Sequence, residues 1–309
     1  MTGAVVEVRG LRKEYGPVVA VDRLDLDVPR GALFGLLGPN GARKSTTFGV
    51  MCGFLRPTAG STTVLGVSSR ELFRLRGRVT ALPQDAAFPR NVSVLSQLVH
   101  FGRLAGLPTP AAHSEAQRVL ELVGMSEAQN RRGGELSHGM AKRVGLAQTL
   151  LASPEVIFLD EPTAGLDPAS SRQLKDLIGK LVPTVTVVLS SHNLAEVQEI
   201  CTHGAILDRG KLVAHGTIDD LTRRGAEVAI EVGASAQVPR EKLAQLFGNE
   251  AVAVDGTRVR ITFSSQSDPA EVISRALRVL LDHQVPILGV HRGTSLEHTF
   301  LEVTRLPAA

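Results

Sequence analysis

Two short stretches of this sequence carry residue types that together could handle a phosphate group. The first, Leu33 to Thr47, contains an apolar segment, a loop with two glycines, and then Lys44-Ser45-Thr46. This order predicts a buried strand, a loop and a helix. Such a loop binds phosphate through backbone N–H groups and the helix N-terminus, while the lysine reaches the terminal phosphates and the serine helps to hold Mg²⁺. The alternative is an ordinary turn before a core helix.

The phosphate loop departs from the usual pattern at one position. That pattern is G-x-x-x-x-G-K-[ST], and Arg43 fills the position of its last glycine. A Cβ and a long side chain restrict how closely the backbone before Lys44 can approach a phosphate. The residues expected to bind nucleotide in this loop are Gly38, Pro39, Asn40, Gly41, Ala42, Arg43, Lys44, Ser45 and Thr46.

The second stretch is the apolar run Val156–Leu159, which ends in Asp160 and Glu161. A continuous apolar run is typical of a parallel strand buried on both faces, and open α/β sheets bind ligands at the C-terminal ends of their strands. Asp160 could hold the Mg²⁺ that accompanies a nucleotide, and Glu161 could polarise an attacking water. A further apolar run, Val185–Ser190, precedes His192 and would bring a third polar residue to this edge. The alternative for the acidic pair is a plain turn after the strand.

The patterns between these stretches predict the elements that position them. Alternating apolar residues near the N-terminus predict antiparallel strands, and from about residue 85 to 135 a helical pattern replaces the sheet. Ser137 is expected to cap the helix that follows it. The predicted strands lie at 5–9, 18–21, 24–28, 61–65, 79–82 and 156–159, with a closing hairpin at 205–216; the predicted helices lie at 94–104, 114–123 and 170–181.

A second unit is predicted to begin near Ala226. Its predicted strands lie at 228–232, 251–254, 258–263 and 287–290, and its helices lie at 269–281 and from Leu296 onward. This strand-rich order indicates a small α+β domain. The sequence therefore predicts a large α/β domain over residues 1–225 and an accessory α+β domain over residues 226–309.

Composition excludes several classes of function. Hydrophobic residues make up 43% of the 309 residues and charged residues 21%, which indicates a globular protein. Lys and Arg exceed Asp and Glu by only 34 to 31 and are scattered, so no nucleic-acid partner is expected. Cys52 and Cys201 match no zinc or redox spacing and are expected to be buried in a reducing compartment. No apolar run reaches the ~18 residues of a spanning helix, and no signal peptide is apparent, so we expect a cytosolic or peripheral membrane protein.

In this order the motifs resemble those of the nucleotide-binding subunit of an ATP-binding cassette (ABC) transporter, in the drug- and antibiotic-export subfamily with a C-terminal extension. The resemblance covers essentially the whole chain. It implies a P-loop NTPase cassette with a parallel core sheet, an antiparallel β subdomain and a helical subdomain at about 85–135, followed by a small C-terminal α+β domain. The matching segments are Walker A at 38–46, the signature at 136–140, Walker B at 156–161, the D-loop at 164–167 and an SLE-type motif at 295–301.

The resemblance implies ATP and Mg²⁺ as cofactors and gives single residues a role. Tyr15 resembles the aromatic residue that stacks on adenine, and Gln84 resembles the Q-loop glutamine. By the same resemblance Glu161 is the catalytic carboxylate and His192 the histidine that steadies the γ-phosphate. The implied Mg²⁺ ligands are Ser45, Gln84 and Asp160, and the remaining residues implied to meet nucleotide are Ser137, Gly139 and Asp167.

The implied partners follow from the fact that each motif occurs once. Ser137 and Gly139 would meet the γ-phosphate held by an opposing subunit, so a second copy or a close paralogue is implied, head to tail. A separate integral membrane permease is implied as well, which would place the chain at the cytoplasmic face of the membrane. Arg43, His138 and Met140 depart from the family pattern. Because of Arg43, a nucleotide-binding but hydrolysis-impaired partner subunit is the alternative.

A cassette ATPase that acts on ribosomes or DNA is the other rival. Proteins of that kind usually carry tandem cassettes or a coiled-coil insertion, and neither occurs in this sequence. Co-purification with an integral membrane protein distinguishes this rival from a transporter subunit, and steady-state ATP turnover distinguishes the hydrolysis-impaired alternative.

Overall fold

The computed structural model describes residues 3–222, 226–234, 236–263, 267–292, 296 and 300, and the chain divides between His215 and Gly216 into two units. The division lies earlier than the expected boundary at residue 225. The last strand of the first unit, β10 (Lys211–Thr217), runs across it, and the short helix α7 (Ile218–Thr222) belongs to the second unit. The boundary at 225 stays a prediction.

An antiparallel sheet forms from the N-terminal segments. β1 (Ala4–Tyr15) pairs with β2 (Val18–Pro29) around a turn at Gly16, and β4 (Ala59–Val64) pairs with the other edge of β1, followed by β5 (Val67–Ser68). The two strands predicted at 18–21 and 24–28 are one strand, within which Arg23 has φ +49°. Polar residues at 22 and 23 interrupt the alternation but do not end the strand.

The core sheet has the order β10-β9-β3-β8-β7-β6. The pairs β9 with β3, β3 with β8, β8 with β7 and β7 with β6 are parallel, so these strands end at one edge. All five residues of β3 are buried, as the continuous apolar run predicts. The bounds are β3 Leu33–Leu37, β6 Val79–Leu82, β7 Val156–Asp160, β8 Thr186–Ser191 and β9 His203–Asp208.

Helices pack on both faces of the core sheet. On one side α1 (Lys44–Met51) lies between the two sheets, where the rings of Phe48 and Phe158 meet edge to face at 5.7 Å. On the other side α6 (Leu194–Ile200) packs so closely that a Cβ at Gly35 would lie 2.4 Å from the Val197 side chain. Cys52 and Cys201 are both free and buried, which confirms their predicted burial, and burial raises the pKa of both thiols.

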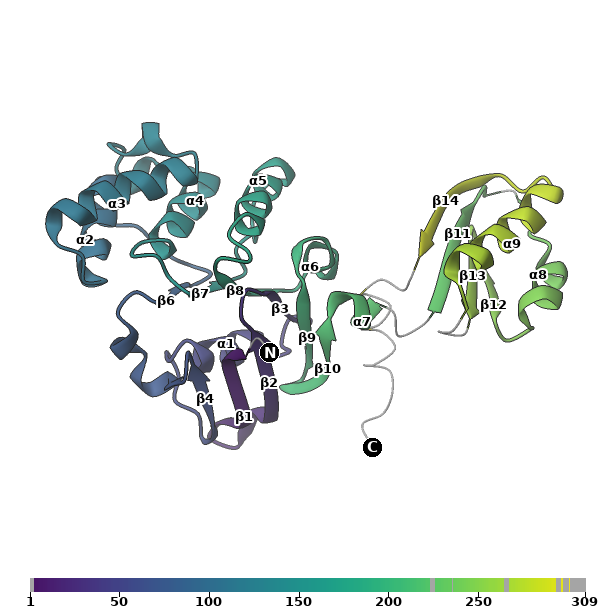
Figure 1. Cartoon of the computed structure of the whole chain (residues 1–309), viewed down its shortest axis with the longest axis horizontal. Helices are drawn as coiled ribbons and strands as arrows, with labels where there is room; N and C mark the ends of the chain where they lie inside the picture. The colour runs from purple at the N-terminus through teal and green to yellow at the C-terminus, as the bar shows by residue number, and fades with distance from the viewer. Residues whose placement is uncertain are drawn as a thin grey trace. The chain divides into compact units, whose positions relative to one another are not determined.

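A helical layer is inserted between β6 and β7 (Figure 1). It contains α2 (Val94–Leu104), α3 (Thr109–Leu122) and α4 (His138–Thr149), which pack against one another. Short 3-10 turns at Ser126–Ala128 and Gly133–Glu135 connect α3 to α4, and another at Ser69–Leu75 precedes β6. The layer includes α4, and the expected extent of the helical subdomain, about 85–135, stays a prediction. After β7, α5 (Pro168–Gly179) leads to β8.

The second unit has its own core. Its strands form an antiparallel sheet of order β12-β13-β11-β14, and in chain order the elements alternate β-α-β-β-α-β, which is the split βαβ arrangement of ferredoxin-like domains. The bounds are β11 Ala226–Val232, α8 Arg240–Phe247, β12 Val252–Asp255, β13 Arg258–Phe263, α9 Pro269–Asp282 and β14 Ile287–Arg292. The predicted α+β class is confirmed, although α8 was not predicted. The SLE-type motif at 295–301 and the helix expected from Leu296 lie outside the described residues, apart from 296 and 300 themselves.

Candidate functional site

The loop between β3 and α1 leaves the N-terminus of α1 open to a ligand. The residue that precedes α1 makes no side-chain cap bond, and the first turn of the helix carries no acidic residue. The loop approaches β9 closely, because a Cβ at Gly38 (φ +154°) would lie 2.4 Å from the carbonyl oxygen of Leu207. Uncapped N–H groups at a helix N-terminus favour anions. The predicted phosphate loop therefore has a local geometry that suits phosphate.

Arg43 adopts the left-handed conformation at the end of this loop. Its backbone has φ 70° and ψ 26°, while its side chain is exposed and its carbonyl oxygen accepts a bond from the Thr47 N–H at 3.1 Å. A glycine takes this conformation freely, whereas an L-residue with a Cβ is disfavoured there by roughly 1–2 kcal/mol. The departure from the family pattern therefore coincides with a backbone conformation that favours glycine.

The Lys44 side chain folds back onto its own loop. Its Nζ donates to the carbonyl oxygen of Gly38 at 2.8 Å and to that of Pro39 at 3.3 Å, and it lies 3.6 Å from Glu161 Oε1. The residue is buried, with 7% of its surface exposed. Oxygen atoms therefore surround the Lys44 ammonium group. Phosphate oxygens are hydrogen-bond acceptors of the same kind and could take their place.

Asp160 and Glu161 share one hydroxyl group at the end of β7. Ser190 Oγ donates to Asp160 Oδ1 at 2.5 Å and accepts from the Glu161 N–H at 3.0 Å. Burial raises the pKa of the Asp160 carboxyl, and the bond from Ser190 opposes this shift. A carboxylate that is partly desolvated is stabilised by a nearby cation. Sequence reasoning missed Ser190, although a polar residue inside an apolar strand was a signal for it.

Glu161 joins two of the other predicted motifs. Its Oε2 lies 2.9 Å from His192 Nδ1, and its Oε1 faces Lys44. The Glu161 side chain is buried, while that of His192 is half exposed. Three residues predicted from separate segments therefore meet at the C-terminal edge of the core sheet, as the parallel strands require.

Gln84 lies at the same edge and is bonded through its backbone. β6 pairs with β7, and Gln84 lies two residues after the end of β6 with an exposed side chain. The carbonyl oxygen of Gln84 accepts a bond from Lys142 Nζ of α4 at 2.8 Å. Burial lowers the pKa of Lys142, against the effects of nearby carboxylates that include Asp160. No sequence pattern indicated a role for Lys142, because a lysine in an amphipathic helix is expected to have an exposed side chain.

Ser137 and Asp167 both act as helix caps. Ser137 Oγ accepts from the Met140 N–H at 3.3 Å, and Asp167 Oδ1 accepts from the N–H groups of Ala169 and Ser170 at 3.1 and 3.0 Å. The pKa of Asp167 is held below its usual value mainly by a hydrogen bond from the Ser170 side chain. The hydrogen bond from the Ser170 backbone lowers this pKa further. Among the contacts of the described residues, none joins Ser137, Gly139 or Asp167 to the group around Glu161 in the same chain.

Tyr15 lies at the tip of the β1–β2 hairpin. Its ring is about half exposed, and Lys13 Nζ lies 4.8 Å from the ring centroid. No contact among the described residues joins Tyr15 to the phosphate loop. Its predicted stacking on adenine stays a prediction.

The oxygen donors at this edge fit a Mg²⁺ ion that arrives with a nucleotide. They are the Ser45 hydroxyl, the Asp160 carboxylate and the Gln84 amide, which are hard ligands of the kind Mg²⁺ prefers. Within the described part of the chain no cluster of three or more His, Cys, Asp or Glu side chains could hold a metal. A Mg²⁺ site that takes one or two carboxylates and completes itself with phosphates and water needs no such cluster.

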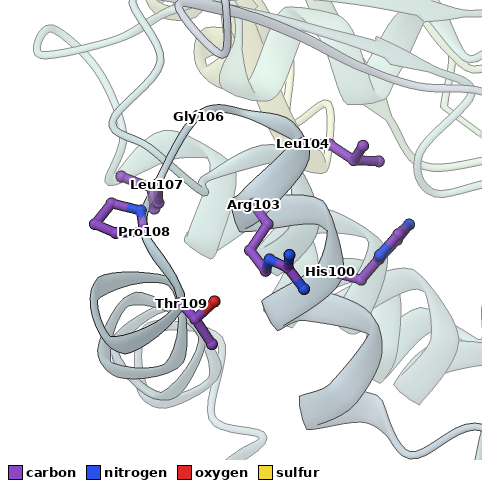
Figure 2. A pocket seen from close by; sticks show the side chains of 7 residues that line it. All are labelled: His100, Arg103, Leu104, Gly106, Leu107, Pro108 and Thr109. Carbon is purple, nitrogen blue, oxygen red and sulfur yellow. The ribbon is translucent and has the colours of Figure 1, made fainter.

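A separate cavity of about 540 Å³ lies in the helical layer. Figure 2 shows His100 and Arg103 projecting from α2 across from Thr109 at the start of α3. The lining contains none of the residues predicted to bind nucleotide. The cavity therefore has no part in the site at the sheet edge.

Comparison with known proteins agrees with the motifs. The family model described as "ABC transporter" matches residues 21–164. The daunorubicin/doxorubicin resistance ATP-binding protein DrrA of Streptomyces peucetius is 32% identical, over 98% of this chain and 93% of that protein. The Nod factor export ATP-binding protein I of Cupriavidus pinatubonensis is also 32% identical, over 97% of this chain and 91% of that protein.

Solved structures share the fold of the first unit. CbiO1 from Clostridium perfringens, part of the ABC transporter complex cbiONQ, has a TM-score of 0.65 at 24% identity and covers 72% of this chain and 92% of its own. The ATP-binding cassette MJ0796, solved as a dimer bound to ADP and Pi, has a TM-score of 0.63 at 20% identity and covers 69% of this chain and 98% of its own. At these identities the likeness shows the fold alone, and it confirms the predicted cassette.

Proposed function

Since this chain belongs to the ABC transporter family, as one of its ATP-binding and ATP-hydrolysing subunits, we propose that it powers export of a small hydrophobic compound through a separate membrane subunit. Two relatives that match almost the whole chain are named as daunorubicin resistance proteins, which supports a drug or antibiotic as cargo. No described helix combines the length and apolarity needed to cross a membrane. The proposal therefore places the transport pathway in a partner and this chain on the cytoplasmic face of the membrane.

The contacts of Glu161 carry the mechanistic part of the proposal. Its carboxylate lies between the phosphate-loop lysine and His192, at 3.6 and 2.9 Å. A carboxylate here can accept a proton from the water that attacks the γ-phosphorus. His192 orients Glu161 and meets the γ-phosphate, and Lys44 exchanges the loop carbonyls for phosphate oxygens.

We assign Mg²⁺ to Ser45, Gln84 and Asp160. When bound, the ion neutralises charge on the β- and γ-phosphates. The partly buried Asp160 carboxyl, whose pKa is raised, supports this assignment because a cation would offset the cost of its desolvation. Lys142 holds the backbone of Gln84 in place through its 2.8 Å bond.

We further propose that two cassettes pair head to tail. Ser137 and Gly139 then complete the phosphate site of a second copy or a close paralogue, which accounts for their separation from Glu161 within one chain. Tyr15 and Asp167 complete the proposed nucleotide contacts. The membrane subunit is the third partner, and co-purification of the tagged chain with an integral membrane protein from its native membrane tests that part.

The hydrolysis-impaired alternative rests on Arg43. A left-handed arginine in the phosphate loop weakens ATP binding if it displaces a loop N–H group. Arg43 leaves the contacts among Lys44, Glu161 and His192 unchanged, so we expect ATP turnover to be retained. A measured turnover no higher than that of a Glu161→Gln variant would favour the alternative.

The Glu161→Gln substitution tests the proposed chemistry. The amide is nearly isosteric but cannot accept a proton from water, so turnover should fall by at least about 10²-fold while ATP binding is kept. Steady-state phosphate release and labelled-ATP binding by the purified full chain measure the two effects. The matched control is Glu121→Gln, which changes an exposed glutamate of α3 outside the group around Lys44. Near-normal turnover in Glu161→Gln would place the base elsewhere.

A further inference from the structure

His138 in the signature segment contacts the D-loop (residues 164–167) of its own chain. Its Nε2 lies 3.2 Å from the carbonyl oxygen of Ala164. A carbonyl oxygen only accepts, so His138 Nε2 must donate. Both the neutral tautomer with Nε2–H and the imidazolium can do so, and the contact therefore persists in both protonation states.

The D-loop leaves room for this imidazole. Gly165 has φ +75°, and a Cβ added there would lie 3.1 Å from His138 Nε2. The next signature residue is equally close to α5, since a Cβ at Gly139 would lie 3.2 Å from Ser170 Oγ. The signature segment and the D-loop therefore touch directly, and the side chain at position 138 provides the hydrogen bond between them.

On its other side, the same D-loop is bonded to the backbone of Glu161. The N–H of Ala164 donates to the carbonyl oxygen of Glu161 at 3.2 Å, and Thr163 Oγ1 donates to Glu196 Oε2 of α6 at 2.9 Å. Ala164 thus accepts from the signature segment and donates to the residue that ends Walker B. A continuous path of hydrogen bonds runs from His138 to the backbone of Glu161.

We propose that His138 is a positioning residue that holds the signature segment against the D-loop, so that both face the nucleotide of a second copy in one fixed arrangement. This rests on the proposed head-to-tail pairing. A glycine at position 138, the residue of the family pattern, offers no side-chain donor. The pairing strength of this chain therefore depends on a hydrogen bond that its family pattern lacks.

The test measures ATP-dependent dimerisation of the full chain in the Glu161→Gln background, where hydrolysis is blocked. His138→Leu and His138→Gly remove the donor, while His138→Gln keeps an amide N–H at a similar reach. We expect the dimer to dissociate about two- to tenfold more readily with Leu or Gly, and Gln to recover most of the loss. Two donor-free variants of different size are used because either one alone could perturb folding.

The control is the ATP affinity of the dilute monomer. If His138 had only a general structural role, its loss would change this affinity as well. The affinity should be the same in all three His138 variants, because the phosphate loop belongs to the same chain and does not contact His138. Equal dimerisation with Leu, Gly and Gln would overturn the role of His138 and leave the proposed pairing intact. Failure of Glu161→Gln itself to dimerise with ATP would overturn the pairing, and the role of His138 with it.

Discussion

Arg43 occupies a backbone conformation that favours glycine, and this should lower the affinity of the loop for ATP. Arg43→Gly should tighten ATP binding by about tenfold, since the conformation disfavours a residue with a Cβ by roughly 1–2 kcal/mol. The guanidinium could offset part of this cost through hydrogen bonds to phosphate. We expect geometry to outweigh charge, because in the proposed site Lys44 and Mg²⁺ would already neutralise the terminal phosphates. Titration with labelled ATP at one fixed Mg²⁺ concentration measures the change.

Arg43→Ala separates the two effects at that position. Alanine keeps the Cβ in the left-handed conformation but removes the charge, so its affinity should stay near or below that of the wild type. Weaker binding in Arg43→Gly than in the wild type would show that the guanidinium is a phosphate ligand and would overturn the geometric argument.

Asp160 is partly buried at the end of β7, and this has a cost in stability at neutral pH. Burial raises its pKa, so the folded protein binds this proton more tightly than the unfolded chain does. Its contribution to stability is therefore more favourable below the unfolded pKa of about 4 and is lost as the pH rises through the folded pKa. Asp160→Asn should melt at a higher temperature than the wild type at pH 7, by about 2–4 °C for each kcal/mol of penalty removed. Calorimetry without nucleotide and with a chelator measures it.

The pH dependence provides the control for Asp160→Asn. The difference in melting temperature should shrink as the pH falls and should be nearly gone below about pH 3, because the wild-type carboxyl is then mostly protonated in both states. A difference that stays constant with pH would assign the effect to the changed hydrogen bond with Ser190 instead. The same variant should lose Mg²⁺-dependent turnover.

At the residue scale, sequence patterns predicted which residues belong to the site but not how these residues contact one another. Glu161, Lys44 and His192 were each predicted from a local motif, and parallel pairing brings them together. The left-handed φ of Arg43 was not predictable from its residue type, because a residue with a Cβ disfavours that conformation. Lys142 was not predictable, because its burial depends on how α4 packs over the loop after β6 and not on its neighbours in sequence.

At the scale of elements, the N-cap of α2 offers a clean stability test. Ser93 Oγ accepts from the Ser96 N–H at 3.2 Å, and Ser93 is not among the residues predicted to bind nucleotide. Ser93→Ala should lower the free energy of unfolding by about 0.5–2 kcal/mol, while Ser93→Asp should retain most of the cap. Urea titration followed by circular dichroism measures both variants. Equal losses in Ala and Asp would show that the cap bond is not the cause.

The element boundaries show where sequence patterns suffice. β13 and α2 match their predicted ranges. In each, apolar residues repeat at a regular spacing, and turn residues or a capping serine mark the ends of the pattern. The helix α8 was missed: its eight residues bury only Leu243 fully, which is too little to give a helical period. β2 was split in two because Arg23 interrupts the pattern of apolar residues without ending the strand pairing.

At the scale of the whole molecule, each unit should fold without the other. The first unit holds the phosphate loop, Asp160 and Glu161, and the second has a separate core around Ile230 and Leu280. A chain that ends at residue 225 should bind ATP with an affinity within about threefold of the full chain, which is under 1 kcal/mol. Labelled-ATP titration of the two chains provides the measurement.

A second truncation sharpens the boundary. A chain that ends at residue 215 cuts into β10, so it should be less stable than the chain that ends at 225. If the longer truncated chain were insoluble or unable to bind ATP, the first unit would depend on the second, and the proposed division would be wrong. Lost dimerisation with retained binding would instead assign pairing to the second unit.

The pairing of β3 has a consequence for synthesis of the chain. Leu33 lies opposite Val187 and Phe34 lies opposite His203, so both sheet neighbours of this fully buried strand are translated long after it. At about 5–20 residues per second, the delay before β9 has been translated is on the order of 10–30 s. During that time β1, β2 and β4 can already pair, while the apolar Leu33–Leu37 segment waits without its neighbours on the ribosome. Substitutions that slow the arrival or docking of β8 and β9 should therefore show first as chaperone binding and aggregation of nascent chains, even where the finished protein hydrolyses ATP normally.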